Sequence, residues 1–405
     1  MRSRKSQYTI SCREVHARAA AVVQEHVRIE DHGHLCRASV LLNLLFFAAS
    51  RISSVFAACR NLADAPSQQA VFNALVTTLP EYHELQQRLN AALVHDLPKA
   101  LRRRPQTLAI DLTLIPYHGQ PQSDPDEIYR SQPKSGTSHF HAYATCYVVR
   151  KGHRFTIALT PVHQGERMEE VVRRLLRMAR TEGVKHRLLL LDRGFYSVAV
   201  IRYLQAARCP FLMPVIGRGR KAEKHKPATG TRAFTAWKKS GWSSHTLSTL
   251  KATKYGKTAT VRICVSCGNF AGKWGRHGRR TFVYAFWGFH PGSTRWVRET
   301  YRTRFGIETS YRQMNEARIR TCSRSPLLRL FFFGLAMILR NVWVWFHLTT
   351  LSERHGRRLI LHLERLRFKD LLLNLQRVAE AALGITQLLM PQPPTLQPLV
   401  PIQCS

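Results

Sequence analysis

The sequence predicts a mixed α/β protein that is preceded by an all-α region and interrupted by a basic, β-rich insertion. Residues 1–100 show helical hydrophobic periodicity and no strand pattern. From about residue 105, short β-rich apolar runs alternate with helical segments, an order typical of helices packed on a mixed sheet. Residues 217–281 hold 16 Lys or Arg and one acid, Glu223. Interspersed Trp and Tyr favour a folded, strand-rich form of this basic segment.

The first hundred residues are expected to form four helices, at 14–27, 36–60, 67–78 and 81–95. The second of these contains one of the chain's two long apolar stretches, 40–59 and 327–346. Arg51 interrupts the first stretch, and Arg329 and Arg340 interrupt the second. A charge near the centre of a membrane span costs about 2.5–3.5 kcal/mol on insertion scales. Buried core helices are therefore predicted, and no membrane partner.

The sheet region begins with a strand at 107–115, in which Asp111 ends the apolar half. The remaining elements are, in order, a polar loop at 116–138, a hairpin at 139–162 turning at Lys151 and Gly152, a helix at 165–183, a buried strand from 186 that ends at Asp192, a helix at 197–208 and a strand at 209–216. The basic insertion follows, assigned to residues 217–293.

A helix is expected around 299–315, with Gly306 as its weakest point. Five polar residues fall within about 80° of one another on this helix: Tyr301, Arg304, Glu308, Arg312 and Asn315. An apolar stripe is expected to dock on the core: Trp296, Ile307, Tyr311 and Met314. A solvated face with an incidental Glu308–Arg312 pair is the plainer interpretation. A long apolar helix then runs to about 349.

The predicted organisation is a helical domain at 1–100, a catalytic core at 105–216 and 294–350 split by the insertion, and a basic helical tail at 351–405 with a disordered end. The chain carries 62 Lys or Arg against 25 Asp or Glu, a formal charge of +37. Such an excess predicts a polyanionic partner. The nine Cys are scattered, which favours a reducing compartment. Cys264 and Cys267 form a CxxC pair but lack a second pair, so ordinary strand cysteines are favoured over zinc.

Two of the few acids end apolar strand segments, Asp111 and Asp192, and Glu308 lies on the polar helix face. A buried carboxylate is unfavourable unless it is paired or binds a metal. An aspartate that caps the following turn is common, so either one alone is weak evidence. Three converging carboxylates could hold two Mg²⁺ ions about 3.5–4 Å apart and activate water or a 3′-hydroxyl.

These residues resemble the DDE transposases of prokaryotic insertion sequences, in the subgroup with a Y-R-E-K signature. The resemblance rests on the order Asp111, Asp192, Glu308, on "LDRGFYS" after the second aspartate, and on Y-x2-R-x3-E at Tyr301, Arg304 and Glu308. It spans roughly residues 105–345. Asn315 stands where the signature has lysine.

The resemblance implies a ribonuclease-H-like core, an N-terminal domain that grips transposon ends, and metal-dependent strand cleavage and transfer. The metal ligands would be Asp111, Asp192 and Glu308, with two Mg²⁺ or Mn²⁺ ions. The residues expected to bind DNA are Tyr301, Arg304, Arg312, Asn315 and Arg193. The expected partners are double-stranded terminal inverted repeats, target DNA and a second copy of the chain, in the prokaryotic cytoplasm near the nucleoid.

Two other functions stay open. An inactive, transposase-derived DNA-binding protein is suggested by Asn315, although the three acids argue against it. A nuclease on the same core that does not join strands is the other. The sequence leaves undecided whether a DNA hairpin intermediate forms, and does not specify the end sequence, the target preference or the oligomer off DNA.

Overall fold

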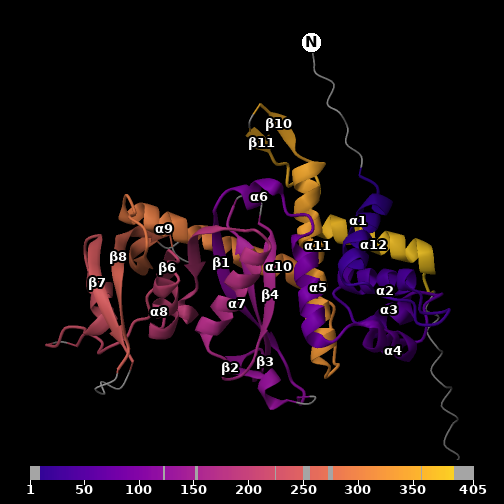
Figure 1. Cartoon of the computed structure of the whole chain (residues 1–405), viewed down its shortest axis with the longest axis horizontal. Helices are drawn as coiled ribbons and strands as arrows, with labels where there is room; N and C mark the ends of the chain where they lie inside the picture. Colours follow the sequence, from indigo (N-terminus) through magenta and orange to yellow (C-terminus); the bar gives the residue numbers. More distant parts are fainter. Residues whose placement is uncertain are drawn as a thin grey trace, which may run out of the picture.

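The computed structural model describes residues 10–121, 124–150, 154–223, 225–249, 256–271, 277–356 and 358–386. The side chains at 270–271, 277, 307–309, 354 and 358 lie outside this description, as do the predicted turn residues Lys151 and Gly152. Figure 1 shows three parts along the long axis: a helical region, a central sheet with helices, and a strand-rich end. The mixed α/β architecture and the mostly helical N-terminal region agree with the sequence prediction.

The N-terminal region contains six helices in its described residues: α1 (Cys12–His26), α2 (Ala38–Ser50), α3 (Val55–Asn61), α4 (Gln68–Thr78), α5 (Tyr82–Val94) and α6 (Lys99–Arg103). Helix α1 starts with a capping box in which Ser11 and Glu14 satisfy each other's backbone amides. The single helix predicted at 36–60 is wrong, because α2 and α3 meet at 105°. Ile52 adopts a left-handed φ of 52°, and Ser54 caps the new helix.

One mixed sheet runs through the rest of the chain, with strand order β2-β3-β1-β5-β6-β9-β8-β7 and β4 paired to β3. Its strands are β1 (Gln106–Pro116), β2 (Tyr129–Lys134), β3 (Thr137–Val148), β4 (Thr156–Val162), β5 (His186–Leu191), β6 (Phe211–Pro214), β7 (Gly241–Ser248), β8 (Thr258–Ala271) and β9 (His277–Trp287). Strands β1, β5 and β6 are parallel, and the other pairs are antiparallel.

The two faces of the sheet carry different helices. Leu108 and Ile110 of β1 belong to the core shared with α7 (Met168–Thr181) and α8 (Val198–Ala206). Ala109 and its neighbours belong to a second core that includes Val297 and Tyr301 of α9 (Thr294–Arg302). Because side chains alternate along a strand, Asp111 lies on the same face as Ala109, toward α9 and α10 (Gly306–Glu316).

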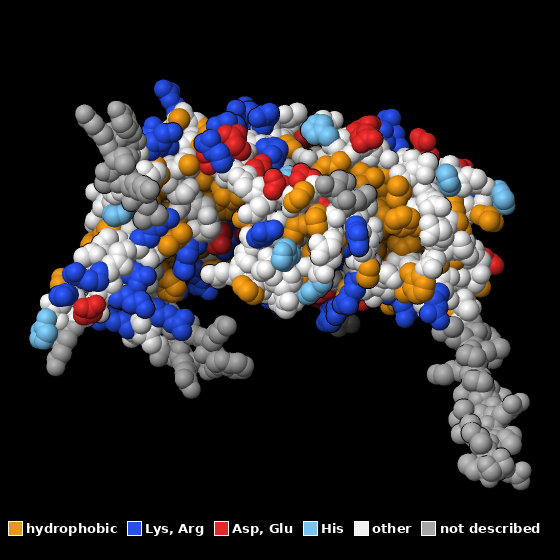
Figure 2. All heavy atoms as spheres, turned by 90° about the horizontal axis from the view of Figure 1, so that it is seen from below, with side chains coloured by type: hydrophobic (Ala, Val, Ile, Leu, Met, Phe, Trp, Pro, Cys, Tyr) orange, Lys and Arg blue, Asp and Glu red, His pale blue; other side chains and the backbone are white. Residues whose placement is uncertain are grey.

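The basic segment is strand-rich, as predicted, and it continues the main sheet through β6 and β9. Figure 2 shows Lys and Arg side chains gathered over the end of the molecule that carries β7 and β8. The exposed basic residues described in this segment are Arg218, Arg220, Lys221, Lys226, Lys238, Lys239, Lys257, Arg262, Arg279 and Arg280. A surface of this charge is suited to a phosphate backbone.

Helix α11 (Pro326–Thr349) packs against α1, α5, α10 and β4, between the helical region and the sheet (Figure 1). Its length and composition would allow a membrane span, but 89% of its most apolar 18-residue window is buried inside the fold. This burial agrees with the predicted core helix. After the short hairpin of β10 (Glu353–His355) and β11 (Arg358–Ile360), helix α12 (Phe368–Leu383) returns to pack on α1 and α2.

Two further local predictions are wrong. The polar stretch expected to be a loop contains β2, whose Tyr129 and Arg130 pair with Phe140 and His139 of β3. The helix expected around 299–315 is interrupted by a 3₁₀ turn, Thr303–Phe305, between α9 and α10. The turn separates the two halves, so Trp296 is 43% exposed whereas Met314 is fully buried.

Candidate active site

Asp111 and Asp192 come together because β1 and β5 are neighbouring parallel strands. Ile110 is in register with Leu191, and each aspartate follows directly in its own strand direction. Beyond this point β5 ends, whereas β1 continues beside β3 alone. The side chain of Asp111 is 15% exposed and that of Asp192 is 44% exposed. The two carboxylates therefore lie where the central sheet opens to solvent.

The guanidinium of Arg304 joins the two carboxylates. Its Nη1 lies 3.3 Å from Oδ2 of Asp111, and its Nη2 lies 3.2 Å from Oδ1 of Asp192. Its Nε donates to the hydroxyl of Tyr301 at 2.9 Å. The Arg304 side chain is only 6% exposed. Burial acts to lower its pKa, but Tyr301 and the two aspartates outweigh burial and hold the pKa of Arg304 above its ordinary value.

Residues of β3 and α10 hold Asp111 and Arg304 in place through hydrogen bonds. Thr145 is the register partner of Asp111, and its hydroxyl lies 2.5 Å from that of Tyr311. The Tyr311 hydroxyl also donates to the Asp111 carbonyl at 3.4 Å. Tyr147 donates to the Arg304 carbonyl at 2.8 Å. Burial, reinforced by Asp111, raises the pKa of Tyr311, so this hydroxyl stays protonated and available as a donor.

The 3₁₀ turn between α9 and α10 directs Arg304 inward. Gly306 follows it, and a Cβ at this position would lie 2.5 Å from Cζ of Arg154. The missing side chain therefore lets the Arg154 guanidinium pack against the start of α10. Helix α9 itself is capped at its N-terminus by Ser293, whose hydroxyl accepts from the Trp296 amide.

A cleft of about 660 Å³ opens beside Asp192 and Arg304. Its lining includes Asp192 and the basic residues Arg193, Arg298 and Arg302. Phe305 supplies exposed aromatic surface, and the buried Tyr301 lies behind it. The cleft thus combines carboxylate oxygens with guanidinium groups and rings, which suits a ligand that carries both phosphates and bases.

The predicted site residues do not all share one face. Tyr301 and Arg304 are buried and bonded to each other, whereas Arg312 and Asn315 are exposed on α10. Arg193 is exposed in the short turn after β5. Glu308 lies in α10, but its side chain is outside the described residues. The predicted single polar face is therefore wrong: the turn at 303–305 breaks the helix, and two carboxylates compensate the burial of Arg304.

Sequence reasoning missed the supporting roles of Thr145 and Tyr147, and it expected Tyr311 only on an apolar stripe that docks on the core. A signal was available for the first two, since Thr145 and Tyr147 are two positions apart on β3 and therefore share one face of the sheet, the face that Asp111 occupies. The CxxC cysteines are strand residues: burial raises the pKa of Cys264 to about 12, and Cys267 Sγ donates to the Trp237 carbonyl at 3.2 Å. In the described part of the chain, neither belongs to a group of three metal-ligating side chains.

The sequence profile of the transposase DDE domain matches residues 102–342, more than half of the chain. The chain belongs to this family of DDE transposases. Both aspartates, Arg304 and the cleft lie inside the matched segment of the transposase. Members of the family generally use divalent metals.

No curated protein matches the transposase sequence. Among solved structures, it is similar to a piggyBac transposase in a synaptic complex with hairpin DNA. The similarity covers 94% of this chain and 75% of that chain, with 12% sequence identity and a TM-score of 0.44.

Proposed function

We propose that this transposase cleaves transposon ends and joins the freed 3′ ends to target DNA, using divalent metal ions held by Asp111, Asp192 and Glu308. One observation carries the proposal: two carboxylates from adjacent strands meet on the guanidinium of Arg304, and one of them, Asp192, lines an open, arginine-lined cleft. The guanidinium of Arg304 offsets the mutual repulsion of the two carboxylates, so both can stay ionised next to each other at the edge of the cleft.

The donor set fits a hard divalent cation. Carboxylate oxygens are the ligands that Mg²⁺ and Mn²⁺ prefer, and Asp192 exposes 44% of its side chain to the cleft. The Arg304 guanidinium lies between the two carboxylates and balances their negative charge. The site therefore already concentrates negative charge that a cation can neutralise. We propose two Mg²⁺ or Mn²⁺ ions. When bound, such ions polarise a phosphodiester and lower the pKa of an attacking hydroxyl or water.

The residues of the cleft would position the DNA. Arg193 and Arg302 are exposed there and can hold phosphates, while Phe305, whose side chain is exposed, presents an aromatic face. The chain's charge of +37 supports double-stranded DNA as the partner. We further propose terminal inverted repeats and target DNA as the substrates. Two ends must be held together, so a homodimer on DNA is the proposed assembly.

The arrangement Tyr301, Arg304, Glu308 supports membership of the Y-R-E-K subgroup of prokaryotic insertion sequences. Asn315, which stands where the signature has lysine, suggests a second candidate function, that of an inactive transposase-derived DNA-binding protein. One experiment separates the candidates. Purified protein is incubated with its flanking terminal repeats, a target plasmid and Mg²⁺, and the products are sequenced. Joined ends support the proposal, cleaved but unjoined ends indicate a nuclease, and bound but intact DNA indicates the inactive protein.

A further inference from the structure

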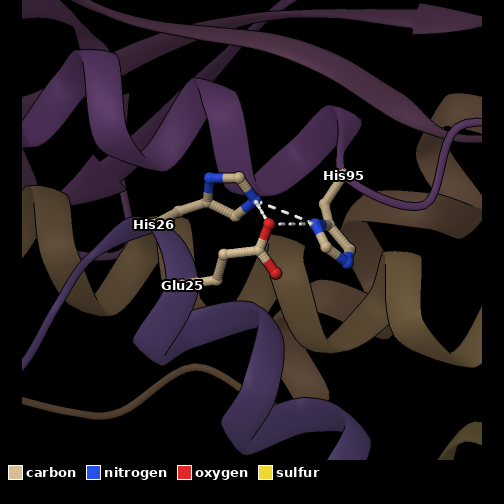
Figure 3. Close-up of side chains that lie close together, drawn as sticks. All are labelled: Glu25, His26 and His95. Atoms are coloured by element: carbon tan, nitrogen blue, oxygen red, sulfur yellow. Dashed lines mark hydrogen bonds and ion pairs between the residues drawn. The ribbon is translucent and has the colours of Figure 1, made fainter.

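A second group of metal-ligating side chains lies in the helical region, away from the DDE site. Glu25 and His26 are the last two residues of α1, and His95 directly follows α5. Figure 3 shows the three side chains pointing toward one another from these two helix ends. Their nearest ligand atoms all lie within 4.8 Å of one another. Among the described residues, this is the only group of three such side chains.

The distances suit a tetrahedral metal centre. Nε2 of His26 lies 2.9 Å from Nδ1 of His95. Oε1 of Glu25 lies 3.4 Å from that Nδ1 and 3.8 Å from the Nε2 of His26. Zinc bonds of about 2.0–2.2 Å in tetrahedral geometry place neighbouring ligand atoms roughly 3.3–3.6 Å apart. The three distances bracket this value, so small side-chain movements would complete three ligand positions.

A second carboxylate lies behind one of the two rings. If His95 used Nδ1 as a ligand, its proton would sit on Nε2. That nitrogen faces Oδ1 of Asp96 at 4.0 Å. Asp96 is itself ion-paired to Arg18 and only 8% exposed. A carboxylate that accepts a hydrogen bond from a ligating histidine is the usual support in protein metal sites, and a small movement of the His95 ring toward Asp96 would form that bond.

The helix ends favour a cation as well. The last backbone carbonyls of a helix carry partial negative charge, and α1 and α5 are 15 and 13 residues long. Both ends already attract cationic groups: Arg88 donates to the Val27 carbonyl at 2.8 Å and Arg102 donates to the Val94 carbonyl at 3.3 Å, so a metal ion would share this negative charge with them.

We propose that Glu25, His26 and His95 bind one Zn²⁺ ion, or another first-row divalent ion that accepts imidazole, with a fourth position left for water. Two imidazoles and one carboxylate select such ions over Mg²⁺, which prefers oxygen ligands. The ion would tie the end of α1 to the end of α5. Helix α5 packs on β4 and α11, so the ion would connect α1 to a helix that contacts the sheet region.

The test uses the full-length chain without a histidine tag. Bound metal is first removed with a chelator, and the protein is then transferred to a buffer with excess Mg²⁺. Zn²⁺ is titrated against a chromophoric chelator, and Co²⁺ is added separately to record its visible absorption. We expect one Zn²⁺ per chain, a tetrahedral Co²⁺ spectrum and a higher melting temperature with Zn²⁺. Asp111→Asn should bind Zn²⁺ like the wild type, because its carboxylate belongs to the other site.

Four variants locate the site. His26→Gln and His95→Gln should each weaken Zn²⁺ binding by more than about 100-fold and abolish the Co²⁺ spectrum, whereas Asp96→Asn should weaken it by about 10–100-fold. His290→Gln, which changes an exposed histidine, should have no effect. Melting of the metal-free proteins identifies any variant that fails to fold, and Glu25→Gln then replaces it because Glu25 is exposed. Equal Zn²⁺ affinity in the wild type and the His26 and His95 variants would overturn the proposal and leave a hydrogen-bonded histidine pair.

Discussion

At the scale of single residues, Arg304 is the centre of the site. It is a nearly buried cation that contacts two carboxylates and a tyrosine hydroxyl. Without it, Asp111 and Asp192 would repel each other across neighbouring strands. The same carboxylates would have to release part of this contact when a divalent cation binds. Arg304 therefore acts as an internal counter-charge in the metal-free protein.

Arg304→Gln should destabilise the metal-free protein by about 2–3 kcal/mol, less than the 3–5 kcal/mol of a fully buried pair because Asp192 is half-exposed. Mg²⁺ should recover more stability in this variant than in the wild type, since the cation replaces the missing charge. Urea unfolding with and without Mg²⁺ measures both effects. Arg302→Gln is the control, because Arg302 lines the same cleft and is exposed. An Arg304 variant that is as stable as the wild type and indifferent to Mg²⁺ would contradict the counter-charge role.

Arg312 and Asn315 give a second prediction at this scale. Both are exposed on α10, so replacing them should not disturb the core. A charge-assisted phosphate contact contributes about 1.5–3 kcal/mol, and a neutral one about 0.5–1.5 kcal/mol. If Arg312 replaces the signature lysine, Arg312→Ala should slow end cleavage by about one to two orders of magnitude and Asn315→Ala by about tenfold or less. Single-turnover cleavage rates of the two variants are compared. A larger loss of rate in Asn315→Ala than in Arg312→Ala, or strong activation by Asn315→Lys, would indicate that Arg312 does not replace the lysine and that this transposase has lost activity.

At the scale of elements, the basic strands β7 to β9 are candidates for DNA contact. Lys238 and Lys239 precede β7, and Arg279 and Arg280 lie in β9 opposite Asn269 and Gly268. Ser240 donates to the Cys267 carbonyl, so the two basic pairs lie at the same end of these strands. Their charges point to one phosphate-binding surface.

Changing these four residues to Gln should flatten the slope of log K against log salt by up to roughly 3–4 units, because each duplex phosphate contact contributes about 0.9. Fluorescence anisotropy with a duplex at several salt concentrations measures the slope. The control changes four exposed basic residues on the α7–α8 side of the sheet: Arg177, Arg180, Lys185 and Arg208. Equal slopes for the two quadruple variants would show that the basic residues of β7 to β9 do not contact DNA.

Helix α11 carries a buried charge that packing alone does not require. Arg340 is 3% exposed, and its Nη1 donates to the Arg154 carbonyl at 2.6 Å. Burial, with Arg154 second, lowers the pKa of Arg340 to about 10. Below pH 10 the group is charged in both the folded and unfolded states, so the penalty is constant through neutral pH. Between pH 10 and the unfolded pKa the unfolded chain binds more protons, and stability rises with pH.

Arg340→Met should therefore leave stability unchanged or raise it by about 1–3 kcal/mol. It should also lower end cleavage, because Arg154 loses the anchor that holds it beside Gly306 at the start of α10. Thermal unfolding at neutral pH and single-turnover cleavage give the two numbers. A variant that is clearly destabilised, or that cleaves at the wild-type rate, would show that Arg340 serves the core and not the site.

At the scale of the whole molecule, the sequence predicts the elements better than their contacts. An apolar run that ends in an acid is a local pattern, so the positions of Asp111 and Asp192 at the ends of strand segments could be predicted from their neighbours in the sequence. The burial of Arg304 could not be predicted in this way. An arginine in a helical segment is expected to face solvent, and only the register of β1 and β5 brings two counter-charges next to it. Strand β2 was missed because "YRSQPK" lacks a β pattern and forms only by pairing with β3. The return of α12 to α1 and α2 is equally non-local.

The central claim is that Asp111, Asp192 and Glu308 act together through a divalent cation. Single-turnover cleavage of an end-containing duplex tests it most directly, in Mg²⁺ and in chelator. We compare Asp111→Asn, Asp192→Asn and Glu308→Gln with Asp126→Asn, an exposed carboxylate that serves as the control. The account predicts that the three site variants bind the duplex but do not cleave it, that Asp126→Asn cleaves normally, and that chelator stops the wild type. Near wild-type cleavage by any of the three, or cleavage in chelator, would contradict it.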